Sequence, residues 1–259
     1  MPPAGAARSP VRVTAVIPTN RGTPLGLRAL REQDVDIDVL VLANGDALAQ
    51  GDEVLRLPWT GHGPVRQAGV RAARGDYILF TVDDALPRGR GCVRAMVDAL
   101  EDGGYDAVFG RQVPWPTSDV VTAERLQDWT PPGQGHWRVE RLDHVFALFR
   151  RQTLLDQPLP TVPIGEDLHW RQGRRIGYVP GATVLHAHAR RPAELYRRTR
   201  DLHIQHHLVG DEPTVPTLGA LTAALPGVLR PVLRRGPGEL ANQLAELFGQ
   251  YRAARLSRG

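Results

Sequence analysis

Two adjacent carboxylates at the end of an apolar run are the residues of this chain best suited to chemistry. Asp83 and Asp84 directly follow the run YILFTV, residues 77–82. Their mutual repulsion requires a compensating charge nearby, and a hard divalent cation supplies one through oxygen ligands. We therefore predict that Mg²⁺ or Mn²⁺ bridges these carboxylates to a diphosphate. A solvated turn is the alternative, because Asp favours turns and Pro87 follows.

A second pair of carboxylates, Glu166 and Asp167, opens a helix that we predict over residues 166–175. Acidic residues at a helix N-terminus complement the helix dipole, and this structural role suffices on its own. The functional alternative is a general base, which requires a carboxylate within hydrogen-bonding distance of an acceptor hydroxyl. The pair alone leaves both roles open.

Two histidines, His186 and His188, end a predicted strand and turn over residues 178–186. Residues i and i+2 of an extended segment share a face, so both imidazoles can point the same way. Together with a carboxylate they would form a metal site, although such a short pattern is also found in structural histidines.

The elements that must position these residues alternate between strands and helices. Predicted strands cover residues 11–17, 37–42, 77–82 and 105–110, and predicted helices cover residues 24–33, 64–74 and 91–100. This alternation indicates an α/β fold with a mostly parallel, Rossmann-like sheet flanked by helices. The strand carboxyl ends then meet at one edge, where ligands bind and where Asp83 and Asp84 would lie.

The second half of the chain has a different pattern. Residues 113–140 are rich in Pro, Trp and Gly, and we predict a long excursion beside the site. Its Trp115, Trp129 and Trp137 either stack on a sugar or aglycone, or anchor the excursion on the core. A strand over 144–149 and a short helix over 150–155 follow.

The C-terminal part is predicted to be a basic helical extension. Helices are expected over residues 192–208 and 238–257, and the apolar stretch 217–233 between them is interrupted by Pro226 and Pro231. An interfacial membrane segment and a packed or dimerising helix pair are both open interpretations of this stretch. A peripheral membrane contact and a homodimer are therefore open partnerships.

Positive charge is concentrated in this extension. All 32 basic residues are Arg and the net charge is +4. The residues from Arg190 onward carry +5 and the preceding ones carry −1. Nucleic acid, an anionic membrane or an anionic substrate would suit such a tail, and a solvated helical face is the simpler interpretation.

The remaining composition limits where the protein works. A single cysteine, Cys92, excludes internal disulfides and fits a reducing compartment. No apolar run is long enough to span a membrane, and the segment MPPAGAARSP lacks the apolar centre of a secretory signal. We therefore expect a cytoplasmic protein, with peripheral contact to the inner face of the membrane left open.

Five ordered motifs resemble those of the inverting nucleotide-sugar glycosyltransferases of family 2, which have the GT-A fold. The motifs lie in the segments VTAVIPTNR, VLVLANGD, GPVRQAGVRAARGDYILFTVDD and GEDLHWRQGRRIGYVPGATVLHAH. The resemblance covers residues 11–190, and the helical tail is similar to those of rhamnosyltransferase-like members. It implies a flexible N-terminus over 1–10, a GT-A domain over 11–190 and the basic extension over 191–259.

The resemblance implies a metal site and a catalytic base. Asp83 and Asp84 match the family's DxD-type motif, and His186 matches the histidine that completes the metal or diphosphate site. The implied cofactor is Mn²⁺ or Mg²⁺. Asp167 matches the catalytic base, and Glu166 matches the neighbour that orients or binds the acceptor.

The resemblance also implies a nucleotide-sugar site. Arg66 matches a helix residue near the base or phosphates, and it would stabilise the departing diphosphate with the metal. Because Ala43 replaces the expected Asp, Asn44 is left to meet the base, with Asp46 as a second candidate. The residues that match the nucleotide-cradling loop are Pro18, Thr19, Asn20 and Arg21.

The implied reaction is a single displacement from a nucleotide-diphosphate sugar to a hydroxyl acceptor. A glycan, a lipid-linked glycan and a small natural product are open acceptors, and no nucleic-acid partner is expected. One alternative is a sugar-phosphate nucleotidyltransferase, whose glycine-rich basic loop is not matched by PTNRGTP. The other is a non-catalytic glycosyltransferase-like binding module, which the replacement at Ala43 favours slightly.

Overall fold

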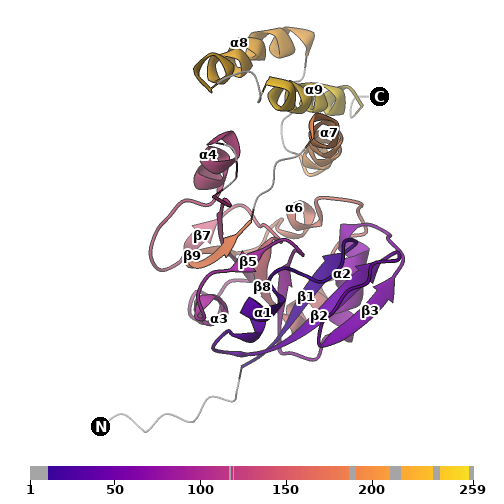
Figure 1. Ribbon diagram of the computed structural model, residues 1–259, viewed down its shortest axis with the longest axis vertical. Helices are drawn as coiled ribbons and strands as arrows, with labels where there is room; N and C mark the ends of the chain where they lie inside the picture. The colour runs from indigo at the N-terminus through magenta and orange to yellow at the C-terminus, as the bar shows by residue number, and fades with distance from the viewer. Residues whose placement is uncertain are drawn as a thin grey trace. The chain divides into compact units, whose positions relative to one another are not determined.

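The computed structural model describes residues 11–116, 118, 120–186, 191–210, 217–235 and 240–256 (Figure 1). The predicted N-terminal segment 1–10 and His188 lie outside these residues. The chain divides into two compact units, residues 1–187 and 188–259. The domain limits drawn from the sequence stay a prediction, because contacts within one chain do not test independent folding.

A mixed sheet forms the centre of the first unit. Within the described part of the chain it has nine strands in the order β3-β2-β1-β4-β8-β6-β9-β5, with β7 paired to β9. The strands are β1 (Arg12–Thr19), β2 (Asp36–Asn44), β3 (Glu53–Leu57), β4 (Tyr77–Thr81), β5 (Leu86–Pro87), β6 (Ala107–Val113), β7 (Trp137–Val139), β8 (Phe146–Arg150) and β9 (Ile176–Leu185).

The long strands of this sheet run mostly in one direction. Strands β3, β2, β1 and β4 are parallel, and β6 is parallel to β9. Only β8 is reversed among these seven, since it pairs antiparallel with both β4 and β6. The predicted α/β fold with a mostly parallel sheet is confirmed.

Helices cover both faces of the sheet because each strand buries alternate side chains on opposite sides. In β1, Val13, Ala15 and Ile17 pack in one core, whereas Val16 packs in the other. The first core takes its helical side chains from α1 (Leu27–Arg31) and α3 (Cys92–Asp102), and the second takes them from α2 (His62–Ala72), α5 (Arg151–Asp156) and α6 (Glu166–Trp170).

Several elements of the first unit differ from the sequence prediction. Strand β5 was not predicted, and α6 ends at Trp170 rather than at residue 175. The predicted excursion 113–140 contains a helix, α4 (Val120–Trp129), and the short strand β7. Strand β3 was not predicted, because its side chains are exposed or only half-buried and the segment has no continuous apolar run.

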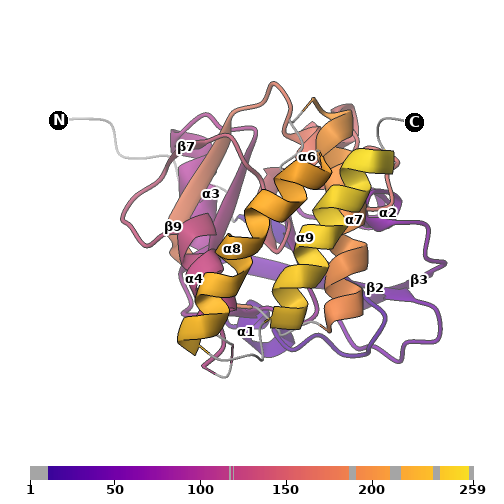
Figure 2. The same cartoon turned by 90° about the horizontal axis from the view of Figure 1, so that it is seen from above.

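The described residues of the second unit form three helices: α7 (Pro192–Leu208), α8 (Leu218–Arg235) and α9 (Leu240–Leu256). Helix α9 packs against both others (Figure 2), and Gly249 lets it approach the α7 backbone, since a Cβ there would lie 2.9 Å from the carbonyl oxygen of Tyr196. None of the helices in the described ranges is long and apolar enough to cross a membrane.

The predicted interruption at Pro226 and Pro231 is wrong, because α8 continues through both prolines. Each proline removes one backbone donor and favours a kink, while its fixed φ remains close to the helical value. The surrounding Leu and Ala residues are strong helix formers, which favours continuation of the helix.

Candidate active site

The loop after β1 is tied to the acidic residues after β4. The hydroxyl of Thr19 donates a hydrogen bond of 2.7 Å to Asp83 Oδ2, and it accepts hydrogen bonds from the backbone N–H groups of Arg21 and Gly22. The backbone N–H of Leu25 donates to the Asp83 carbonyl at 2.8 Å. Adjacent parallel strands thus bring the predicted nucleotide loop and the first acidic residue together.

The second acidic residue, Asp84, lies between a cation and an imidazole. Arg21 Nη1 is 3.1 Å from Asp84 Oδ2, and His186 Nε2 is 3.4 Å from Asp84 Oδ1. Arg21 is 63% exposed, so its side chain can turn from Asp84 to an incoming anion. The structure therefore brings together Arg21, Asp84 and His186, while the roles assigned to them stay predictions.

These residues fit a divalent cation that takes some of its ligands from the protein and the others from a bound substrate. No group of three His, Cys, Asp or Glu side chains in the described ranges is placed to hold a metal by itself. Mg²⁺-type ions are commonly held by one or two carboxylates plus substrate phosphates, so such a cluster is not required.

The carboxyl end of β2 presents a buried amide at the same edge. Asn44 Nδ2 donates hydrogen bonds of 3.4 Å to the carbonyl oxygens of Thr19 and Leu42. Its Oδ1 is buried without a hydrogen-bond partner. Such an acceptor is costly to leave unpaired, which makes it suited to a ligand donor. Of the other predicted loop residues, Pro18 is half-buried and Asn20 is exposed.

Helix α2 is clamped to the segment that leads into α6. Gly63 packs so closely on the carbonyl oxygen of Pro160 that a Cβ would clash with it. The Gln67 amide donates to the Leu154 carbonyl at 3.0 Å and accepts from the Leu159 backbone N–H at 2.9 Å. These contacts bring Arg66, the residue between them in sequence, against α6.

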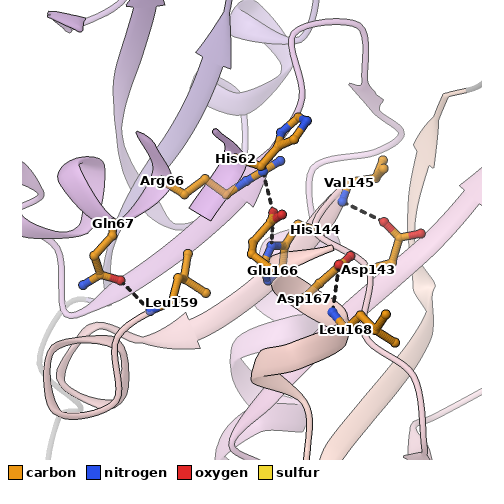
Figure 3. Close-up of polar contacts among 10 residues, drawn as sticks. All are labelled: His62, Arg66, Gln67, Asp143, His144, Val145, Leu159, Glu166, Asp167 and Leu168. Atoms are coloured by element: carbon orange, nitrogen blue, oxygen red, sulfur yellow. Dashed lines mark hydrogen bonds and ion pairs between the residues drawn. The ribbon is translucent and has the colours of Figure 1, made fainter. Parts of the chain in front are cut away.

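Arg66, Glu166 and His144 form a buried polar cluster (Figure 3). Arg66 Nη1 lies 2.6 Å from Glu166 Oε1, and His144 Nδ1 lies 3.0 Å from the same oxygen. His62 Nδ1 contacts Arg66 Nη1 at 3.2 Å. Burial by itself would raise the pKa of Glu166, but the Arg66 charge and the His144 hydrogen bond outweigh it, and the pKa is lowered.

Arg66 thus has a different contact from the one the family resemblance implies. Its guanidinium is nearly fully buried in the ion pair with Glu166. The implied contact with the nucleotide phosphates stays a prediction, while the contact with the second acidic motif is observed.

The pKa of the neighbouring carboxyl group, Asp167, is shifted in the opposite direction. Burial raises its pKa, and although His144 opposes this shift, the negative charges of Glu166 and Asp143 reinforce it. Asp167 Oδ1 accepts one hydrogen bond of 2.9 Å, from the backbone N–H of Leu168. A carboxylate with a raised pKa is a stronger base, so the pair Glu166 and Asp167 combines a permanent anion with a proton acceptor.

Sequence reasoning missed His62, Gln112, Asp143 and His144. We placed His144 inside a strand over residues 144–149, whereas β8 begins at Phe146, so Asp143 and His144 lie just before it. The available signal was a polar dipeptide directly before the apolar run VFALF. His62 and Gln112 carried no local signal that separates them from ordinary helix and strand residues.

The sequence profile of glycosyl transferase family 2 matches residues 37–155. This range extends from β2 to α5 and includes Asp83, Asp84 and Arg66. The match covers just under half of the chain and supports the resemblance to glycosyltransferase family 2. The match favours a glycosyltransferase over the nucleotidyltransferase alternative.

Solved structures show the same fold. The mannosyltransferase PcManGT from Pyrobaculum calidifontis, in complex with GDP-Man and Mn²⁺, is 19% identical with a TM-score of 0.63, covering 97% of this chain and 88% of that chain. S. aureus TarS in complex with UDP-GlcNAc is 13% identical with a TM-score of 0.53, covering 92% of this chain and 90% of that chain. The GT-A fold is thus confirmed for this chain.

No curated protein sequence matches the chain. The similarity of the helical tail to rhamnosyltransferase-like members therefore stays a prediction. The same holds for the roles assigned to individual residues of the site.

Proposed function

We propose that this protein is a family 2 glycosyltransferase that moves a sugar, with inversion, from a nucleotide-diphosphate donor to a hydroxyl acceptor in a metal-dependent reaction. The observation that carries the proposal is the electrostatic contrast within the second acidic pair. Glu166 is held as a buried anion, while Asp167 beside it has a raised pKa. A raised pKa makes the Asp167 carboxylate a stronger general base.

The donor would bind at the carboxyl ends of β1, β2 and β4. Arg21 can turn from Asp84 to the diphosphate, and the unpaired Oδ1 of Asn44 can accept a hydrogen bond from the base. The complexes of the two solved relatives with GDP-Man and with UDP-GlcNAc support a nucleotide-sugar donor.

A divalent cation fits the acidic residues after β4. Asp84 and His186 would hold Mn²⁺ or Mg²⁺, with Asp83 beside them, and the ion when bound would neutralise charge on the departing diphosphate. Thr19 keeps Asp83 in place through its 2.7 Å hydrogen bond. The presence of Mn²⁺ in the mannosyltransferase complex supports this proposal.

Asp167 would accept the proton of the acceptor hydroxyl as that oxygen attacks the anomeric carbon. Glu166 strengthens this base by holding a negative charge beside it, and Arg66 and His144 keep Glu166 ionised. General base catalysis of this kind contributes about 10²–10⁴-fold to the rate. Attack from the face opposite the departing diphosphate inverts the anomeric configuration.

We infer that the enzyme works in the cytoplasm. Its only cysteine, Cys92, is buried and unpaired, which fits a reducing compartment.

The acceptor is a hydroxyl compound, and a glycan, a lipid-linked glycan and a small natural product are the candidates to be screened.

The test is donor binding and turnover across UDP-, dTDP- and GDP-sugars with Mn²⁺, Mg²⁺ or EDTA. We expect one nucleotide to bind only with metal, and we expect Asp84→Ala to abolish this binding. Asp102→Ala, an exposed carboxylate at the end of α3, is the matched control and should bind normally. The product anomer, measured by NMR, should be opposite to that of the donor.

Two results would contradict the proposal. Transfer by the wild type in EDTA would refute the metal dependence. Tight donor binding without turnover of any donor or acceptor would favour a non-catalytic binding module.

A further inference from the structure

A series of hydrogen bonds extends from His186, which lies beside Asp84, to strand β6 and on to helix α4. His186 Nδ1 lies 2.8 Å from Oε1 of Gln112, a buried residue of β6. Gln112 Nε2 donates to Asp143 Oδ2 at 2.6 Å. The same Asp143 oxygen accepts a hydrogen bond of 3.0 Å from Nε1 of Trp129, at the end of α4.

The direction of each hydrogen bond in this series follows from which groups can donate and which can only accept. Asp143 receives three N–H donors, from Gln112, Trp129 and the backbone of Val145, which is the environment of an ionised carboxylate. An ionised carboxylate only accepts hydrogen bonds, so the NH₂ group of Gln112 must face Asp143. The amide oxygen of Gln112 must then face His186.

An amide oxygen also only accepts, so Nδ1 of His186 must carry a proton. In the neutral imidazole the lone pair is therefore on Nε2. This is the atom that lies 3.4 Å from Asp84 Oδ1. Two acceptor atoms facing each other repel, and a cation that both of them bind removes the repulsion.

We propose that Gln112 and Asp143 are positioning residues that fix His186 as the Nδ1–H tautomer and thereby direct Nε2 to the cation held by Asp84. The inference rests on the proposed metal dependence. It adds to the proposed metal site two residues that lie outside the sequence motifs, and it assigns the donor and the acceptor of each hydrogen bond between them and His186. Loss of such an outer partner typically costs about 10–100-fold in metal affinity.

The same contacts connect α4 to the metal-binding residues. The hydroxyl of Thr130 donates to the Gln112 carbonyl at 3.0 Å and accepts from the Gln112 backbone N–H at 3.3 Å. The Arg141 guanidinium lies over the Trp129 ring, 5.1 Å from its centroid. Trp129 is thus an anchor of the predicted excursion, and its indole N–H completes the environment of Asp143.

The first test reads the tautomer without metal or substrate. We expect ¹⁵N NMR of the metal-free wild type, at about pH 8 where an ordinary imidazole is neutral, to show His186 protonated on Nδ1. Gln112→Met keeps a similar shape but removes the acceptor, and it should release a mixture of tautomers. A wild-type His186 protonated on Nε2 overturns the proposal.

The second test measures Mn²⁺ affinity by calorimetry with UDP, dTDP and GDP. Gln112→Met should bind Mn²⁺ about 10–100-fold more weakly than the wild type. Gln33→Met is the matched control, because Gln33 is also buried and hydrogen-bonded but lies between α1 and α3. It should leave both the tautomer and the affinity unchanged. If Gln112→Met does not fold, Asp143→Asn replaces it, and the same losses are expected.

The outcomes separate this inference from the proposed function. A wild type that binds no Mn²⁺ with any of the three nucleotides overturns the metal dependence, and the metal-directing role with it. A wild type that binds Mn²⁺, together with a Gln112→Met variant of equal affinity, overturns only the role of Gln112 and Asp143.

Discussion

The ion pair between Arg66 and Glu166 predicts a large and specific loss of stability in Arg66→Met. Both side chains are only 5% exposed, and their charged atoms are 2.6 Å apart. Met fills similar volume but leaves the Glu166 carboxylate buried without its cation. Breaking a buried pair in this way costs about 3–5 kcal/mol, and we expect about 3 because the His144 hydrogen bond remains.

The assay is the free energy of unfolding from urea denaturation, with tryptophan fluorescence as the signal. In a double-mutant cycle, Glu166→Gln should cost less in the Arg66→Met background than in the wild type, because the unpaired charge is removed. Arg28→Met is the control, since it breaks an exposed pair with Glu32 and should leave the free energy of unfolding unchanged.

The effect should also depend on pH in a defined direction. Folding lowers the pKa of Glu166, so the pair stabilises the folded state above the unfolded pKa of about 4.3. This contribution is lost as the pH falls further toward the folded pKa. The difference between wild type and Arg66→Met should therefore be full at pH 7 and shrink below about pH 4. A loss under about 1 kcal/mol at pH 7 would refute the assigned pair.

Three further predictions concern the second acidic pair and the segments that position it. Glu166→Gln removes a charge that raises the pKa of Asp167, so the acidic limb of the kcat/KM profile should move to lower pH, and an unmoved limb would contradict the coupling. Gly165 has φ +78°, so Gly165→Ala should lower the free energy of unfolding by about 1–2 kcal/mol, whereas Gly181→Ala, in open space, should not. Gly63→Ala should displace α2 from Pro160 and lower both stability and kcat, and wild-type values for both would contradict the close packing.

The sequence predicted the strands that are buried and continuous. The run before Asp83 is bounded by Gly75 and by two carboxylates, so β4 was located to within a residue. Strand β3 could not be predicted, because it is an edge strand whose side chains are exposed or half-buried. It is defined by its pairing with β2 and not by a hydrophobic pattern in its sequence. The continuous helix α8 could not be predicted from local sequence, because Pro226 and Pro231 favour a break while the Leu and Ala residues around them favour a helix.

The residues of the candidate site also fall into those that could be predicted from the sequence and those that could not. The carboxylates at Asp83 and Asp84 could be predicted because they directly follow an apolar strand. The partners of Glu166 could not, since Arg66 is 100 residues away and His144 is 22 residues away. Only the order of strands in the sheet and the clamp between α2 and the segment before α6 bring these side chains together.

The measurement that tests the central claim most directly compares donor binding and turnover in Asp167→Asn. Asn keeps the shape of Asp but cannot accept the acceptor proton. We predict that calorimetry will show wild-type affinity for the donor nucleotide and metal, while turnover falls by about 10²–10⁴-fold. Turnover at the wild-type rate would contradict the assignment of Asp167 as the general base.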